Sequence, residues 1–107
     1  MKITTLEALR PLNGTEGWFY SLDWQGEGRP GPLLKVRMAE FRWGVMFSTG
    51  DGPDDVDYAI QDDTPEGTWA FFPSETRARL SHQGACSRWA YDRREADNAY
   101  LRDVCGL

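Results

Sequence analysis

Residues 33–48 have the sequence LLKVRMAEFRWGVMFS, and the alternation of apolar residues along them decides the fold. These residues occupy even positions in the first half and odd positions in the second, namely Leu34, Val36, Met38, Phe41, Trp43, Val45 and Phe47. A period of two is typical of a β-strand with one buried face. Because a shift of one residue moves every side chain to the other face, residues 39–40 are predicted to hold a bulge or a turn. The stretch is therefore expected to form two strands or one long bent strand.

Shorter stretches on both sides of it also indicate strands, at residues 18–24, 56–60 and 68–72. In the first of them every even position is apolar, while Ser21 and Asp23 lie on the opposite face. The links between strands are polar, rich in Gly and Pro, and too short to hold crossover helices. We therefore predict an antiparallel meander.

The beginning of the chain fits two local structures. Thr5 can cap a short helix that Pro11 and the Asn13-Gly14 pair would end, whereas residues 3–5 also fit a short strand. Both interpretations remain open from the sequence.

The last third of the chain predicts a helix. Asp92 and Glu95 have the spacing of a capping box, so the helix is expected to run from there to about Cys105, with Gly106 past its end. An apolar stripe would pack this helix on the sheet, formed by Ala96, Tyr100 and Val104 with Leu101 and Cys105 alongside. Residues 75–83 fit a helix with Ser74 as N-cap, and they fit a strand equally well.

Together these patterns predict an α+β fold. It has a single antiparallel sheet of about four to six strands, a C-terminal helix on one face and a short helix at the N-terminus. The 107 residues are 40% hydrophobic and 27% charged, which is the composition of a globular protein. Halves of such a chain would be too small for separate cores, so residues 1–107 are expected to form a single domain.

Composition also bears on location. No apolar run approaches the roughly 20 residues that span a bilayer, and the start of the chain lacks the apolar segment of a signal peptide. Two cysteines, Cys86 and Cys105, are too few for a disulfide scaffold, and the sequence leaves open whether they are free or bonded. We expect a soluble cytoplasmic protein without a membrane partner.

The net charge of −5 is concentrated in one segment. Residues 49–75 contain eight acidic residues and no basic one, whereas the rest of the chain has an excess of three basic residues. The acidic residues are Asp51, Asp54, Asp55, Asp57, Asp62, Asp63, Glu66 and Glu75. A direct nucleic-acid binder needs a cationic surface, so that class is disfavoured.

The sequence does not match the motifs of common enzyme active sites and metal sites. His82 is the single histidine, which excludes a zinc site built on paired histidines, and no phosphate-binding glycine motif occurs. Cys86 follows His82 by four residues, but a Cys–His nucleophile also needs an orienting third residue. The aspartates from residue 51 onward miss the spacing of an EF-hand loop. A different calcium site or a pair of carboxylates for glycoside hydrolysis remain alternatives, and we expect no enzyme, metal or cofactor.

The acidic segment has a structural and a functional interpretation. Its carboxylates could solvate loops and protect a sheet edge, or they could present a negative field to a basic surface. Aromatic residues, 13% of the chain, include more tryptophans than one small core can bury, and this favours aromatic interface anchors. The predicted partner-binding residues are Asp51, Asp54, Asp55, Asp57, Tyr58, Asp62, Asp63, Glu66 and Trp69.

The chain contains no family motif, but in physical type it resembles small acidic inhibitors that bind and block another protein. Phage-encoded inhibitors of bacterial defence, including anti-CRISPR proteins, and immunity proteins of nuclease toxins are of this type. The resemblance implies a partner with a basic surface, such as a nuclease or another nucleic-acid-binding complex. The alternative is a small-ligand or carbohydrate-binding module that uses exposed aromatic rings of the sheet.

Overall fold

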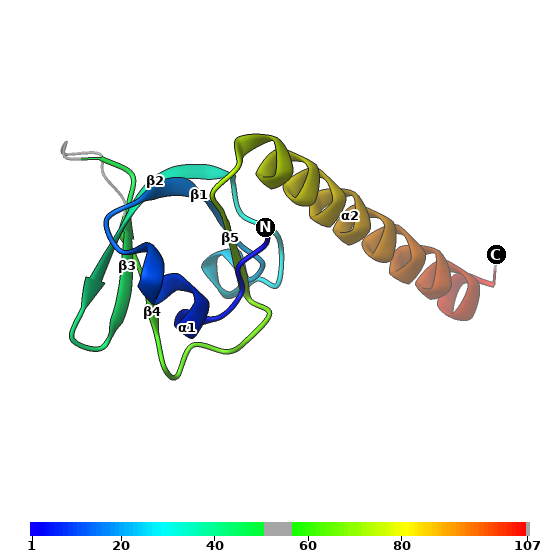
Figure 1. Cartoon of the computed structure of the whole chain (residues 1–107). Coiled ribbons are helices and arrows are strands. Elements are labelled where there is room, and N and C mark those ends of the chain that lie inside the picture. The colour runs from blue at the N-terminus through cyan, green and yellow to red at the C-terminus, as the bar shows by residue number, and fades with distance from the viewer. Residues whose placement is uncertain (51–56, 107) are drawn as a thin grey trace.

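The computed structural model describes residues 1–50 and 57–106, and it has the predicted α+β architecture (Figure 1). Five strands form one antiparallel sheet in the order β4-β3-β2-β1-β5. In chain order the elements are α1 (Leu6–Leu9), the 3-10 helix η1 (Arg10–Leu12), β1 (Glu16–Ser21), the 3-10 helix η2 (Trp24–Gly26), β2 (Leu34–Phe41), β3 (Gly44–Ser48), β4 (Asp57–Gln61), β5 (Trp69–Phe72) and α2 (Glu75–Cys105). Strands β1 to β4 follow the predicted meander, but the last strand does not: β5, which a meander would place beside β4, pairs with β1 at the opposite end of the sheet.

The hairpin of β2 and β3 confirms the two phases of residues 33–48. Val36 and Met38 are buried on β2, and Val45 and Phe47 are buried on β3. Phe41 pairs with Gly44, so even residues of β2 face odd residues of β3, and this register explains the change of phase. The turn is therefore at residues 42–43. The expected bulge or turn at residues 39–40 was wrong, because both residues lie within β2 and pair one to one with residues 46 and 45 of β3.

Strands β1 and β5 are covered on both faces. Phe19 and Phe71 belong to the main core inside the curved sheet, whereas Tyr20 and Phe72 belong to a second cluster together with Ala78 of α2. This corrects the prediction for residues 18–24, because the face opposite Tyr20 is buried rather than polar. The strand itself ends at Ser21, and residues 24–26 form η2.

Helix α2 begins 17 residues before the predicted start at Asp92. Ser74 occupies the N-cap position, and residues 75–83 are helical. Ala78 is fully buried against the sheet, and the hydroxyls of Tyr20 and Ser81 are 2.7 Å apart, so tertiary contacts select helix here. Residues 92–95 lie inside the helix, which means that the capping-box interpretation was wrong. The C-terminal boundary is confirmed, because Gly106 has a left-handed φ of 71°.

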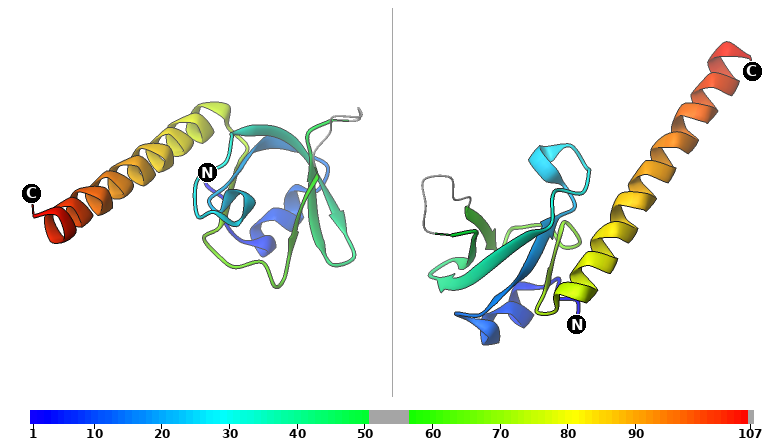
Figure 2. Two further views of the ribbon diagram at one scale, coloured as in Figure 1. Left: turned by 180° about the vertical axis from the view of Figure 1, so that it is seen from behind. Right: turned by 90° about the horizontal axis from the view of Figure 1, so that it is seen from above.

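The second half of α2 extends past the sheet (Figure 2). Tyr100 and Val104, which were expected to pack on the sheet, are 61% and 63% exposed. The apolar stripe that includes Ala96 is therefore not a core face, since the helix leaves the sheet before these positions. Cys86, nearer to the sheet, is a free, half-buried thiol.

At the N-terminus the structure has the helix that the sequence allowed, and in place of the alternative strand over residues 3–5 it has a single bridge at Ile3. Thr5 caps α1, with its Oγ1 accepting a hydrogen bond from the Ala8 N–H at 3.3 Å. Just before it, Ile3 forms an isolated antiparallel bridge to Phe71 on the outer edge of β5. No helix in the described part of the chain is long and apolar enough to cross a membrane.

Candidate functional site

Six of the nine predicted partner-binding residues lie on β4, on β5 or on the loop between them. Asp57 is exposed at the start of β4, and Asp62, Asp63 and Glu66 are exposed on the loop. The other three, Asp51, Asp54 and Asp55, lie outside the described residues.

The two predicted aromatic anchors differ in exposure. Tyr58 is half-buried, with its ring centre 5.4 Å from that of Phe19 and 5.6 Å from that of Trp24. Burial raises the pKa of the Tyr58 hydroxyl above its usual value. Trp69 is only 3% exposed and packs near Phe47, so it is a core residue and not the exposed anchor that the sequence suggested.

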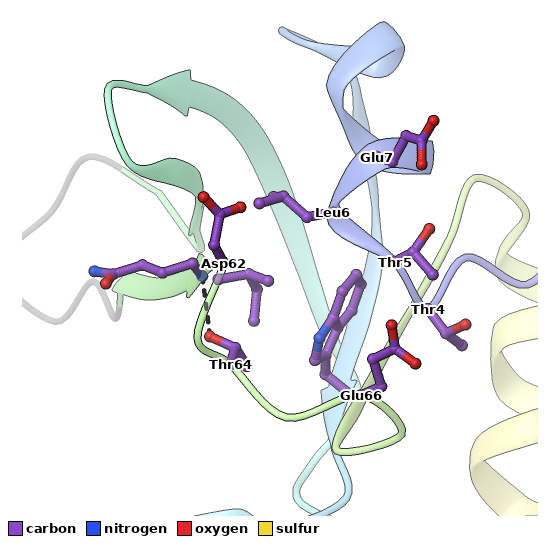
Figure 3. A pocket seen from close by; sticks show the side chains of 10 residues that line it. Thr4, Thr5, Leu6, Glu7, Asp62, Thr64 and Glu66 are labelled. Atoms are coloured by element: carbon purple, nitrogen blue, oxygen red, sulfur yellow. Dashed lines mark hydrogen bonds between the residues drawn. The ribbon is translucent and has the colours of Figure 1, made fainter.

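A small hollow of about 230 Å³ lies between the start of α1 and the end of β4 (Figure 3). Three carboxylates surround it, contributed by Glu7 of α1 and by Asp62 and Glu66 of the loop. Its other lining residues are Thr4, Thr5, Leu6, Ile60, Gln61, Thr64 and Trp69. Sequence reasoning missed Glu7, because nothing in the local pattern indicates that α1 lies beside the β4–β5 loop.

Local hydrogen bonds hold this loop. Gln61 donates its backbone N–H to Thr64 Oγ1 at 3.0 Å, and its carbonyl accepts the Thr64 N–H at 3.0 Å. Further along, the Thr68 hydroxyl donates to the Pro65 carbonyl at 2.7 Å. The side chains of Thr64 and Thr68 therefore hold the loop, and its acidic side chains, Asp62, Asp63 and Glu66, are exposed.

A second hollow of about 270 Å³ adjoins the first, because Ile60, Thr64 and Trp69 line both. It lies along β4 and reaches the end of β1, and its remaining lining residues are Phe19, Ser21, Asp23, Tyr58, Ala59, Pro65 and Thr68. We call the two hollows, together with the exposed acidic residues of α1, β4 and the β4–β5 loop (Glu7, Asp57, Asp62, Asp63 and Glu66), the β4 seam. The seam thus combines an apolar floor with an acidic rim.

The acidic rim is not neutralised from within the described structure. Four ion pairs occur among the described residues, Arg10–Glu40, Arg29–Glu27, Arg37–Glu16 and Arg79–Glu75. None of the five rim carboxylates takes part in one. Their charge is therefore available to a cationic group from outside the chain.

The His82–Cys86 pair is close in space, but its hydrogen bonding does not suit nucleophilic catalysis. His82 Nε2 is 2.6 Å from the Gly31 carbonyl oxygen and 3.6 Å from Cys86 Sγ. Since a carbonyl oxygen only accepts, Nε2 must donate its proton to Gly31 and has no lone pair for the thiol proton. His82 instead connects α2 to the loop that precedes β2.

Metal ligands are not gathered in the described part of the chain, where no three His, Cys, Asp or Glu side chains form a group that could hold an ion. Comparison with protein-family models, with curated proteins and with solved structures finds no match for the chain. The geometry of the β4 seam is therefore the basis for a functional proposal.

Proposed function

We propose that this chain is a non-enzymatic binding protein that docks the β4 seam on a basic surface of another protein. The observation that carries the proposal is the un-neutralised acidic rim around an apolar floor. Charges on an interface rim guide association and select partners of opposite charge, while buried apolar contacts at the centre supply affinity. Both features occur together at the seam.

The proposed partner is a protein that handles nucleic acid. Such proteins have cationic grooves built for phosphates, and a row of carboxylates presents a similar negative field. The seam would occupy part of that groove and block it, in the manner of an anti-defence inhibitor or an immunity protein. Since surface charges are screened over about 8 Å at physiological salt, binding should weaken steeply as salt rises.

The small-ligand alternative has less support in the described residues. Both hollows of the seam are smaller than the roughly 300–1,000 Å³ typical of ligand pockets. Two hollows elsewhere, of about 420 Å³ beside β2 and about 480 Å³ on α2, are within that range, but no aromatic ring lines either of them. The exposed aromatic rings do not form one platform on the sheet either. Trp43 is 63% exposed at the β2–β3 turn, whereas the exposed Tyr91 and Tyr100 are on the far part of α2, on the other side of the molecule (Figure 1).

The test compares two variants with the same change in net charge. One reverses Asp62, Asp63 and Glu66 to Lys at the seam, and the control reverses Asp92, Glu95 and Asp97 to Lys on α2, where all three are exposed. Binding to a panel of purified nucleases and DNA-binding proteins is measured by surface plasmon resonance, at low and high salt and with competing duplex DNA.

We expect at least one panel protein to bind, with DNA as a competitor. The seam variant should bind about tenfold more weakly or worse, and the α2 variant should bind nearly as well as the original chain. Equal losses in both variants would mean that only total charge matters, and no loss in the seam variant would contradict the proposal directly.

A further inference from the structure

The two edge strands of the sheet differ in whether another segment of the chain covers them. On β5, the edge is covered by the N-terminal segment, because Ile3 and Phe71 exchange two backbone hydrogen bonds of 2.9 Å. On β4, no described residue pairs with the edge that faces away from β3. An uncovered edge offers backbone donors and acceptors to another strand.

The register of β4 identifies which residue offers them. Both backbone groups of Gln61 bond to Thr64 and therefore point away from β3. In an antiparallel ladder the direction of these groups alternates along the strand, so the N–H and C=O of Ala59 point the same way as those of Gln61. Ala59 is exposed and lines the second hollow of the seam. Its backbone groups thus face the open side of the seam.

We propose that an extended, Lys- or Arg-bearing segment of the partner adds to β4 as a further strand and pairs with Ala59. This inference rests on the proposed function and specifies how the partner is held. Main-chain bonds supply affinity in strand addition, while alternating side chains supply specificity. One set of side chains would meet Tyr58 and Pro65 in the second hollow, and the cationic set would meet the acidic rim.

The acidic residues at the ends of β4 favour a basic segment of a partner over the β4 strand of a second copy of the chain. Acidic residues lie at both ends of β4, with Asp57 at the start and Asp62 and Asp63 just past the end. An antiparallel pair of two β4 strands would bring these like charges together, which destabilises pairing. A segment with basic residues gains from the same positions.

The experiment uses the full chain and a short end-blocked peptide that alternates valine with lysine. Two further peptides have N-methyl groups on alternate residues, one at the valines and the other at the lysines. Only one set of amides in an added strand faces β4, so one methylated peptide should bind about fivefold more weakly or worse and the other nearly as well as the parent. Amide hydrogen exchange at Ala59 should slow when the parent peptide binds.

A variant of the protein gives an independent test. Ala59→Pro removes the outward N–H without removing a β3–β4 hydrogen bond, and proline is tolerated at such edge positions. With unchanged far-ultraviolet circular dichroism, the variant should lose affinity for the parent peptide as the methylated peptide does.

The outcomes separate the two proposals. If binding is abolished by the Asp62, Asp63 and Glu66 reversals but both methylated peptides bind equally well, strand addition is wrong and the proposed function stands. If the parent peptide does not bind even at low salt, strand addition is wrong, and the panel experiment alone then decides the proposed function.

Discussion

Gly17→Ala tests the pairing of β1 with β5, which closes the main core. A Cβ atom at Gly17 would collide with the ring of Phe71 and would lie 2.8 Å from the carbonyl oxygen of Phe72. Neither neighbour can easily move. Phe71 has no exposed surface and its ring centre is 5.4 Å from that of Phe47, while the Phe72 oxygen belongs to the paired backbone of β5.

The magnitude follows from two opposing effects. Overfilling a packed core costs about 1–3 kcal/mol, whereas alanine in a strand regains about 0.5–1 kcal/mol of backbone entropy relative to glycine. The free energy of unfolding should therefore fall by about 1–2 kcal/mol. For a domain of this size that lowers Tm by about 4–8 °C.

Thermal unfolding followed by circular dichroism measures this change, and Gly84→Ala is the matched control. An added Cβ at Gly84 meets nothing within 4 Å, and the residue lies inside α2. This variant should raise Tm by about 2–4 °C, because alanine favours a helix interior by about 0.5–1 kcal/mol over glycine. A Tm for Gly17→Ala equal to or above that of the original chain would refute the close approach of β1 and β5.

Three further predictions concern the hydrogen bond between the sheet and α2, the ionisation of Tyr58 and the local stability of α2. Tyr20→Phe should lower the free energy of unfolding by about 1 kcal/mol, and a double-mutant cycle in urea with Ser81→Ala should show non-additivity if their hydrogen bond is real. Burial raises the pKa of Tyr58 in the folded state, so its contribution to stability should be present below pH about 10 and lost as pH rises through the folded pKa. An ultraviolet titration of Tyr58→Phe should lack this late ionisation, and an unchanged titration would contradict it. Amide exchange should be faster at residues 93–104 than at residues 78–86, since the far part of α2 has no sheet beneath it; equal protection would show that it is held by contacts beyond the sheet.

Much of the sheet was predictable because its patterns are local. Val36 and Met38 alternate on one strand and Val45 and Phe47 on the next, and a period of two identifies such strands in isolation. The place of β5 beside β1 was not predictable in this way. It depends on contacts between residues far apart in sequence, such as the close approach of Gly17 and Phe71.

Helix α2 was predicted at its end but not at its start. Gly106 marks the end by its own backbone conformation, whereas residues 75–83 have a pattern that fits two structures. Only the second cluster around Tyr20 and Phe72, which buries Ala78, favours the helix. Tertiary packing therefore overrode a weak local preference.

The candidate site, like the fold, was predictable from the sequence only in part. Charge counting located the acidic segment, and the structure places Asp62 and Glu66 at one hollow. Exposure depends on the whole fold, so sequence could not show that Trp69 is buried beneath these residues or that Glu7 joins them from α1.

The overhanging part of α2 also determines how the molecule rotates in solution. The molecule measures 55 × 30 × 29 Å along its principal axes, and α2 runs toward one end of the long dimension (Figure 2). Rotation about the short axes is therefore slower than rotation about the long axis. Peptide N–H bonds lie nearly parallel to a helix axis, whereas those of the sheet point in several directions. The amides of α2 should consequently relax with a longer apparent correlation time than those of the sheet, which makes nuclear spin relaxation a direct measure of the helix direction.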